Sequence, residues 1–202
     1  MPTMKKVMQF VESPLDRMVK LIESGRFETG RNLDRDFDRF SASMKKTKHP
    51  ESLTFYSKPE YQEKGARLFK VEGEDAGYAL TDNGEIISVF NNSGVRDVAP
   101  HLIKDAMRRG GNHLDHYGYT KHNDVYGKQG LIKYGSFKFD PRYNEGWNVD
   151  LLGTPDYVYR GTPEYILEEC ADPSNELCND FGELPPKLYE ELMLRRKNFG
   201  KR

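Results

Sequence analysis

Three runs rich in β-branched and aromatic residues follow one another between residues 66 and 90, and they constrain the fold more than any other feature. The runs are ARLFKVEG, GYAL and EIISVF. The pair Asn83-Gly84 separates the second run from the third and is a strong signal for a two-residue hairpin turn. This region therefore predicts three neighbouring antiparallel strands, with any helices packed on the faces of that meander.

Helical and β-like segments alternate after the meander. The segment PHLIKDAMRRGG carries an apolar stripe at helical spacing and stops at Gly110-Gly111. A short strand over HLDHYGY follows, then a helix over 124–129 and a strand over 134–139. The order β-β-β-α-β-α-β predicts an α+β (mixed α/β) domain with a central mixed, mostly antiparallel sheet flanked by helices.

The N-terminal part of the chain is predicted to be helical. Apolar residues recur at helical spacing over Pro14–Ser24, and Ser13 supplies an N-cap. A second, mostly charged helix is expected over Asn32–Lys46, with a narrow apolar stripe that packs on another element. A short strand is expected at Leu53–Tyr56. We therefore describe residues 1–65 as a helical N-terminal extension.

The C-terminal part has a different composition. After Trp147 the chain is rich in glycine and proline, and short helices are expected over Pro163–Cys170 and Pro186–Asn198. Basic residues lie near the end of the last of these, where they complement the helix dipole. We therefore describe residues 148–202 as a loop-rich extension that ends in a helix, and residues 66–147 as the core.

Charge and aromatic content limit the function classes. The chain has 31 Lys and Arg against 32 Asp and Glu, a net charge of −1, and its 12 Tyr and 11 Phe argue against disorder. A protein whose main task is to bind nucleic acid usually has a basic surplus. The overall charge therefore predicts a folded domain without a strong general attraction for polyanions.

The two cysteines and the apolar runs bear on the compartment. Cys170 and Cys178 lie in a polar segment without a C-x-x-C pattern, so we expect reduced thiols rather than a disulfide framework or a zinc site. No uninterrupted apolar run is long enough for a membrane span, which needs about 18 residues. The N-terminal segment is broken by Glu12 and Asp16 and does not resemble a signal peptide. These features predict a cytoplasmic protein.

Three stretches of the core resemble a known superfamily. GYALTDNGEIISVF, HLDHYG and VYGKQGLIKYGSFKF occur in that order, with a loop and a helix between the first two. Together they resemble the GNAT superfamily of N-acyltransferases, and in particular the GNAT-like proteins of bacteriophages. The resemblance covers residues 66–147. It implies a GNAT-like fold that transfers an acetyl or acyl group from acetyl-CoA to an amine without a metal.

The resemblance assigns two catalytic roles. Tyr126 lies where the superfamily places its general acid, followed by Gly130, although an ordinary helix end has the same pattern. A phenol with a pKa near 10 is protonated at neutral pH and can donate to a departing thiolate. Glu85 begins the strand on which some members carry the glutamate that activates the amine; a solvent-facing hairpin position is its alternative. Other candidate proton acceptors are Asp115, Asp124, His116 and His122.

The resemblance also assigns the cofactor contacts. The backbone of Val89, Phe90 and Asn91 would pair with the pantetheine arm of acetyl-CoA. The loop Ser93–Ala99 would hold the pyrophosphate at a helix N-terminus, where backbone N–H groups bind anions. The loop residues named for this role are Ser93, Gly94, Arg96 and Ala99.

This loop departs from the superfamily pattern, which is Arg/Gln-x-x-Gly-x-Gly/Ala. The register set by Leu102-Ile103 puts Gly94 in place of the Arg or Gln and Asp97 in place of the central glycine, and Ala99 alone matches. A carboxylate aimed at a pyrophosphate repels it. Arg96 could pair with a phosphate if the loop took another register.

Two other interpretations remain open. The same fold without a working cofactor loop would act as a binding module for a host or virion protein. Aromatic residues interleaved with lysines and arginines between Tyr117 and Trp147 suggest nucleic acid as another partner. A metal site is not expected, because His113 and Asp115 would share one face of a strand while His116 points to the other.

Overall fold

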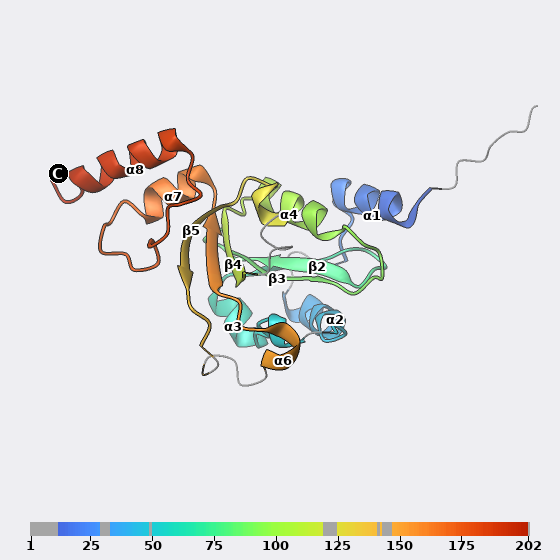
Figure 1. The fold of residues 1–202 in the computed structure, drawn as a ribbon. Coiled ribbons are helices and arrows are strands. Elements are labelled where there is room, and N and C mark those ends of the chain that lie inside the picture. The colour runs from blue at the N-terminus through green and yellow to red at the C-terminus, as the bar shows by residue number, and fades with distance from the viewer. Residues whose placement is uncertain are drawn as a thin grey trace, which may run out of the picture.

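The computed structural model of the chain describes residues 12–28, 33–48, 50–118, 125–140, 142 and 147–201. It contains two three-stranded antiparallel sheets surrounded by helices (Figure 1). The predicted α+β class is confirmed. The sheet is divided, however: instead of one continuous mixed sheet, a single parallel bridge between Glu85 and His113 links the two sheets.

The first sheet is the predicted meander. Its strands are β1 (Arg67–Lys70), β2 (Ala76–Leu80) and β3 (Ile86–Asn91), paired in the order β1-β2-β3. All five residues of β2 are buried, as expected for the central strand of a sheet covered on both faces.

The turn between β2 and β3 differs from the two-residue hairpin that Asn83-Gly84 predicts. Thr81 and Glu85 pair across a three-residue loop, in which Gly84 has a φ of 88°. The Thr81 hydroxyl accepts a hydrogen bond from the Glu85 backbone N–H at 2.9 Å. A three-residue loop that ends in a left-handed glycine is the next most common hairpin connection, and the threonine cap favours it here.

Helices cover both faces of the first sheet. The helices α1 (Pro14–Glu23) and α4 (Ala99–Arg108) lie on one face, and α2 (Leu33–Met44) and α3 (Lys58–Glu63) lie on the other (Figure 1). The expected helices over 14–24 and 32–46 are thus confirmed, whereas α3 was not predicted. Residues 53–56 do not form the expected strand; they follow the 3₁₀ helix η1 (Pro50–Ser52) as a bend and irregular chain.

The second sheet contains a strand that the sequence pattern did not predict. Its order is β4 (His113–Tyr117), β6 (Tyr157–Gly161) and β5 (Ile132–Phe137), and β6 pairs antiparallel with both neighbours. The central strand of this sheet therefore comes from the segment that we described as a loop-rich extension. The boundary after Trp147 does not coincide with a structural boundary, because β6 joins the segment to the core.

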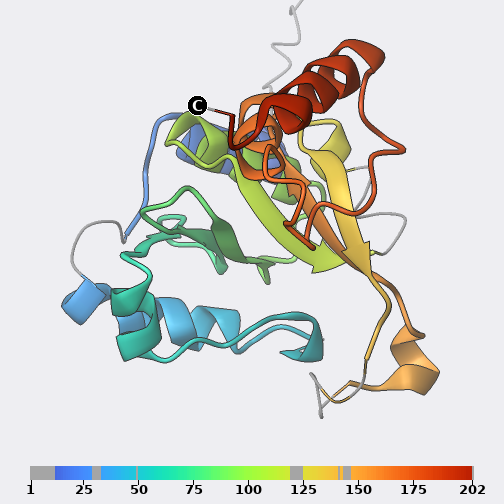
Figure 2. The same cartoon turned by 90° about the vertical axis from the view of Figure 1, so that its left-hand side faces the viewer.

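The remaining helices are α6 (Val149–Leu152), α7 (Pro163–Glu169) and α8 (Pro186–Asn198). The last two match the helices expected near the C-terminus. They form a small layer on the side of the second sheet that faces away from the first sheet (Figure 2). Their buried side chains pack with Tyr134 of β5 in a hydrophobic cluster of their own.

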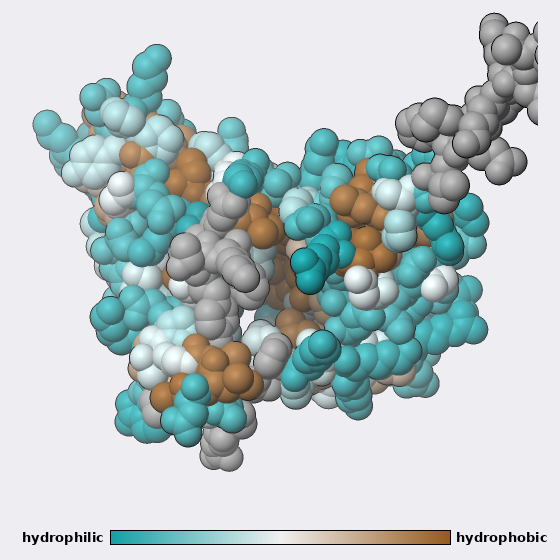
Figure 3. All heavy atoms as spheres, turned by 45° about the vertical axis from the view of Figure 1, so that its right-hand side comes forward, coloured by the Kyte–Doolittle hydropathy of each residue, from teal (hydrophilic) through white to brown (hydrophobic). Residues whose placement is uncertain are grey.

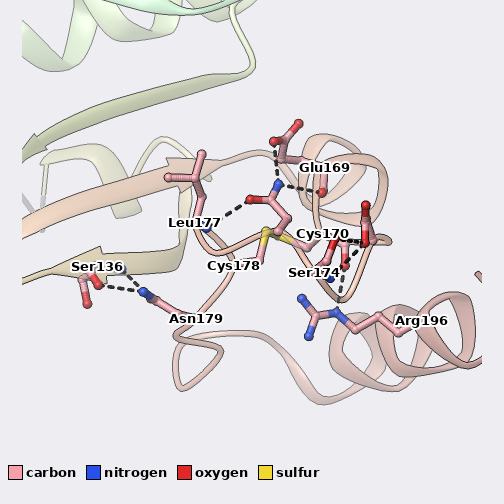
Figure 4. The surroundings of a disulfide bond; sticks show 10 residues. Ser136, Glu169, Cys170, Ser174, Leu177, Cys178, Asn179 and Arg196 are labelled. Carbon is pink, nitrogen blue, oxygen red and sulfur yellow. Dashed lines mark hydrogen bonds between the residues drawn. A yellow bond between two sulfur atoms is a disulfide. The ribbon is translucent and has the colours of Figure 1, made fainter.

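The expectation of two reduced thiols is wrong, because Cys170 and Cys178 form a disulfide (Figure 4). Both side chains are buried in the cluster around α7 and α8, and the chain returns on itself after α7 so that the Cα atoms lie 5.6 Å apart. Asn175 stabilises this return, since its side-chain amide donates to the Glu169 backbone carbonyl at 3.2 Å. Spacing alone did not reveal that the segment doubles back.

The segment after the disulfide closes the free edge of β5. The side-chain amide of Asn179 accepts a hydrogen bond from the Ser136 N–H at 2.9 Å and donates to the Ser136 carbonyl at 3.0 Å (Figure 4). A Cβ atom at Gly135 would lie 1.8 Å from the Leu177 carbonyl oxygen, so this close approach requires glycine. An edge strand covered in this way cannot pair with another chain.

Within the described ranges, no helix has both the length and the apolar character needed to cross a bilayer.

Candidate functional site

The two sheets meet at one point and separate beyond it. Glu85 bridges to His113, and the Asn112 N–H donates to the Gly84 carbonyl at 2.9 Å. Beyond this junction β3 pairs only with β2 and β4 pairs only with β6. Figure 3 shows the surface hollowed between the C-terminal elements and the rest of the molecule, with hydrophobic side chains at the floor of the hollow.

A cavity of about 310 Å³ lies between the diverging strands. Residues of β3, of β4 and of the 47–56 segment form most of its wall, and Ala99 at the start of α4 and Tyr157 of β6 complete it. The side chains and backbone that line the cavity are those of Thr47, Ser52, Leu53, Thr54, Tyr56, Ile86, Ile87, Ser88, Val89, Phe90, Asn91, Ala99, Leu114, Asp115, His116, Tyr117, Val125, Tyr126 and Tyr157.

A β-bulge turns the middle of β3 toward this cavity. Ala79 pairs with Ile87 and Gly77 pairs with Phe90, so Ser88 and Val89 together oppose one residue of β2. Ser88 has a φ of 52°, a left-handed conformation that is uncommon outside glycine. Its hydroxyl lies 2.7 Å from the Tyr61 hydroxyl, which holds the bulge from the α3 side. A bulge leaves its extra residue out of the ladder, so backbone groups here are available to a ligand.

Asp115 and Glu85 bring two carboxyl groups together at the junction. Asp115 lies on β4 and lines the cavity, whereas Glu85 lies just before β3, near Asp115 but outside the cavity wall. Burial and the neighbouring Glu85 carboxylate raise the pKa of Asp115 to about 7. A carboxyl group with such a pKa can accept a proton at neutral pH and release it again.

Lys64 and Tyr56 border the carboxyl pair. The Lys64 ammonium lies 3.5 Å from the nearer Glu85 carboxylate oxygen and 5.2 Å from the centre of the Tyr56 ring. Burial, followed by the charges of Glu85 and Asp115, raises the pKa of Tyr56 to about 12. The phenol therefore stays protonated at neutral pH and can donate a hydrogen bond.

Tyr126 approaches the cavity from the α4 side of the sheet. Residues 125–127 form a helical turn, and Gly130 follows with a φ of 90°. The Tyr126 ring packs against the ring of His116, with the ring centroids 4.6 Å apart. Burial, followed by the charge of Asp115, raises the pKa of Tyr126 to about 12. This phenol is also protonated at neutral pH.

A buried arginine supports Tyr126. Arg160 lies on β6, is 2% exposed, and donates to His116 Nε2 at 3.2 Å and to the Leu131 carbonyl at 3.0 Å. Its charge is offset by an ion pair with Glu183 at 3.2 Å. Because Nε2 accepts a hydrogen bond from Arg160, His116 is neutral, and its Nδ1–H points to the Tyr117 carbonyl at 2.7 Å. Arg160 thereby holds both the ring next to Tyr126 and the end of the turn that carries it.

The expected phosphate loop is tied to itself. The Asn91 side chain donates to the Val95 carbonyl at 2.7 Å and accepts from the Ser93 hydroxyl at 2.6 Å. Arg96 is exposed, and no ion pair of its side chain is recorded with another described residue. Asp97 is also exposed and takes a φ of 62°, in the position where the superfamily pattern has glycine.

The structure brings most of the predicted residues to one place. Val89, Phe90, Asn91, Ala99 and Tyr126 line the cavity, as do Asp115 and His116, two of the alternative proton acceptors. Glu85 does not line the cavity, but its charge raises the pKa of Asp115, which does. Ser93, Gly94 and Arg96 do not line it. His122 and Asp124, the other named acceptors, lie outside the described residues, as do Tyr119, Lys121 and Tyr143 of the aromatic and basic series.

The sequence pattern missed several residues of this site. Tyr56 lies in a segment that was predicted to be a strand, and Arg160 and Tyr157 lie on β6, which was not predicted. The alternation YVYR was the available signal for β6, but its flanking prolines and glycines favoured a loop. On β4, Asp115 lies near Glu85 and the His116 ring packs against Tyr126, and both β4 residues line the cavity.

Comparison of the chain with protein-family models, with curated proteins and with solved structures finds no match in any of the three.

Proposed function

We propose that this protein is a GNAT-like N-acyltransferase that moves an acetyl or acyl group from acyl-CoA to an amine. One observation carries the proposal: the cavity between β3 and β4 contains a carboxyl group poised near neutral pH, Asp115, and a protonated phenol, Tyr126. Acyl transfer from a thioester to an amine requires one group of each kind. The separation of the two sheets beyond a single parallel bridge also agrees with the splayed sheet that the resemblance implies.

The proposed roles follow from the geometry. Asp115 accepts a proton from the ammonium group of the acceptor and releases it to solvent; burial, followed by the charge of Glu85, keeps the pKa of Asp115 high enough for this exchange. The neutral amine nitrogen then attacks the acyl carbonyl; a C–N bond forms, the nitrogen passes its surplus proton to Asp115, and the C–S bond breaks. Tyr126 donates its phenolic proton to the departing sulfur. The bulge at Ser88 and Val89 supplies backbone N–H groups that can stabilise the oxyanion.

The nucleotide end of acyl-CoA is the less favourable part of the fit. The start of α4 at Ala99 and the exposed guanidinium of Arg96 offer a phosphate the groups that it needs. Asp97 lies between Arg96 and Ala99 in the sequence, and its carboxylate repels a phosphate. Because Asp97 is exposed, solvent screens this repulsion, so we expect weaker phosphate binding rather than none. The pantetheine end would occupy the cavity itself.

A thermal-shift titration tests the proposal. Acetyl-CoA at 100 times its dissociation constant adds about 2.7 kcal/mol to the free energy of unfolding, which raises the Tm by a few degrees. ADP is the matched control ligand, because it carries the nucleotide without the pantetheine arm. Ala99→Phe is the matched variant, since the new ring fills the cavity mouth. The proposal is wrong if acetyl-CoA does not stabilise the native chain and if no amine causes it to release its thiol.

A second function is favoured by a separate observation. The last helix, α8, exposes Tyr189 and Leu194, and Phe199 directly after it is also exposed. Together with the unfavourable Asp97, these side chains support a binding module that contacts another protein, of a host or a virion, through its C-terminal face. This second function would be supported if the chain does not bind acyl-CoA and if Leu194→Glu abolishes its binding to a partner protein.

A further inference from the structure

The wall of the cavity has an unusual distribution of charge. Among the described residues that line it, Asp115 is the one with an acidic side chain, and none is a lysine or an arginine. His116 also lines it but is neutral, because its Nε2 accepts a hydrogen bond from Arg160. The described part of the wall therefore contains one anionic group and no cationic group.

Aromatic rings make up much of the remaining wall. Tyr56, Tyr117, Tyr126 and Tyr157 all line the cavity. Tyr56 comes from the segment before α3, Tyr117 ends β4, and Tyr157 starts β6, so the rings surround the space from several elements. Tyrosine rings attract cations through their faces. The Asp115 carboxyl group and these rings together form a surface that is complementary to an ammonium group.

The protein already holds one ammonium group in this manner. Lys64 Nζ lies 3.5 Å from a Glu85 oxygen and 5.2 Å from the centre of the Tyr56 ring, outside the cavity wall. Asp115 and Tyr56 both line the cavity, so a carboxyl group and a tyrosine ring are also offered there. The chemistry that holds Lys64 is therefore repeated where a substrate would bind.

We propose that the acceptor is a small amine that carries no carboxylate or phosphate beside its amino group. The inference rests on the proposed acyltransferase function and specifies its substrate class. A free α-amino acid would bring a second negative charge close to Asp115 with no cation among the described wall residues to balance it. An aliphatic or arylalkyl amine places its ammonium at Asp115 and its apolar part against the tyrosine rings.

Matched pairs of substrates test this inference. Tyramine and tyrosine differ by one carboxylate, as do cadaverine and lysine, and each is offered with saturating acetyl-CoA while thiol release is followed. We expect kcat/KM to be at least about tenfold higher for the amine of each pair, since tenfold corresponds to about 1.4 kcal/mol. Equal rates within both pairs, or faster transfer to the amino acids, would overturn the inference.

A binding measurement separates this inference from the proposed function. The Tm of the chain without acetyl-CoA is recorded with each member of a pair, and we expect stabilisation by tyramine and cadaverine but not by their carboxylated partners. Asp115→Asn should abolish the difference, whereas Glu183→Gln, at a half-exposed position on the far side of Arg160, should keep it. If acetyl-CoA stabilises the chain but the amine and the amino acid of each pair have the same effect, the proposed substrate class is wrong and the acyltransferase function is not contradicted. Failure to bind acetyl-CoA contradicts the acyltransferase function.

Discussion

The carboxyl group of Glu85 lies close enough to that of Asp115 to raise the Asp115 pKa, and of the two residues Asp115 is the one that lines the cavity. Glu85 directly precedes β3 and Asp115 lies on β4, and the parallel bridge between Glu85 and His113 brings these two segments together. Burial, followed by the charge of Glu85, disfavours the ionised form of Asp115 and raises its pKa to about 7. The junction thus creates the titrating group on which the proposed chemistry depends.

The first prediction concerns the pH dependence of the rate. Asp115 must be ionised to accept a proton, so kcat/KM should rise with pH through a midpoint near the Asp115 pKa of about 7. Glu85→Gln removes the neighbouring charge and should move the midpoint to lower pH. Asp115→Asn should lower the rate about 10²–10⁴-fold at all pH values. A midpoint that stays in place in Glu85→Gln would contradict the coupling between the two residues.

The same pair predicts a pH-dependent stability. The folded-state pKa of Asp115 is raised from 3.8 to about 7, so the folded chain favours the protonated form and ionisation of Asp115 costs stability. The cost appears as the pH rises between these two values and remains above them. Relative to Asp115→Asn, the native chain should therefore lose about 2–4 kcal/mol between pH 4 and pH 8. Urea unfolding of both chains across this range measures the difference, and a constant difference would contradict the raised pKa.

Tyr126→Phe tests the proposed acid. Burial and the charge of Asp115 raise the Tyr126 pKa to about 12, so the native phenol has a proton to donate at neutral pH. Its loss should lower kcat about 10²–10⁴-fold while acetyl-CoA binding is retained. Tyr189→Phe is the matched control, because Tyr189 is exposed on α8. A Tyr126→Phe chain that turns over as fast as this control would exclude Tyr126 as the acid.

Arg160→Met tests the support behind Tyr126. The substitution leaves His116 Nε2 and the Leu131 carbonyl without their buried donor, so we expect a loss of about 1–3 kcal/mol of stability for each group left unsatisfied. It should also lower kcat, because the turn that carries Tyr126 is no longer held. Glu183→Gln keeps both donated hydrogen bonds and should have a small effect, since Glu183 is half-exposed. Equal losses in the two variants would show that the ion pair, not the hydrogen bonds, is what matters.

Asp97 should limit the affinity for acyl-CoA in two separable ways. Asp97→Gly removes both the carboxylate and the strain of a residue with a φ of 62°. Asp97→Asn removes the charge and keeps a side chain that tolerates this conformation. We expect both variants to bind acetyl-CoA more tightly at low ionic strength, by about three- to tenfold, and the gain to shrink in salt. Asp97→Gly alone should also raise the Tm.

The disulfide should stabilise the C-terminal unit without affecting the cavity. Replacing both Cys170 and Cys178 by serine frees a short loop with a sequence separation of 8, for which about 2–3 kcal/mol of stability is lost. Acetyl-CoA binding should be unchanged, because neither cysteine lines the cavity. Mass spectrometry of the purified chain without reductant tests whether the disulfide forms. If Cys170 and Cys178 stay reduced in the native compartment, that result would agree with a reducing cytoplasm.

Local patterns predicted most elements but not the pairing of the second sheet. The N-cap Ser13 and the stripes of α1 and α4 act through neighbouring residues, and these helices lie where expected. The strand β6 differs because its stability comes from pairing with both β4 and β5, and its buried Arg160 does not look like a core residue in sequence. The burial of its charge is compensated only when the fold brings Glu183 and His116 next to the Arg160 guanidinium.

The sequence by itself determined the longer helices, the meander and the residue types from which a proton acceptor and a proton donor can be chosen. Periodicity, caps and turn residues carry this information because each acts over a few positions of the chain. Tertiary structure alone decided that Glu85 meets Asp115, that Asp115 rather than Glu85 faces the cavity, and that Cys170 meets Cys178. These contacts depend on how separate segments pack, and the environment that raises the pKa of Asp115 exists only once both sheets have formed.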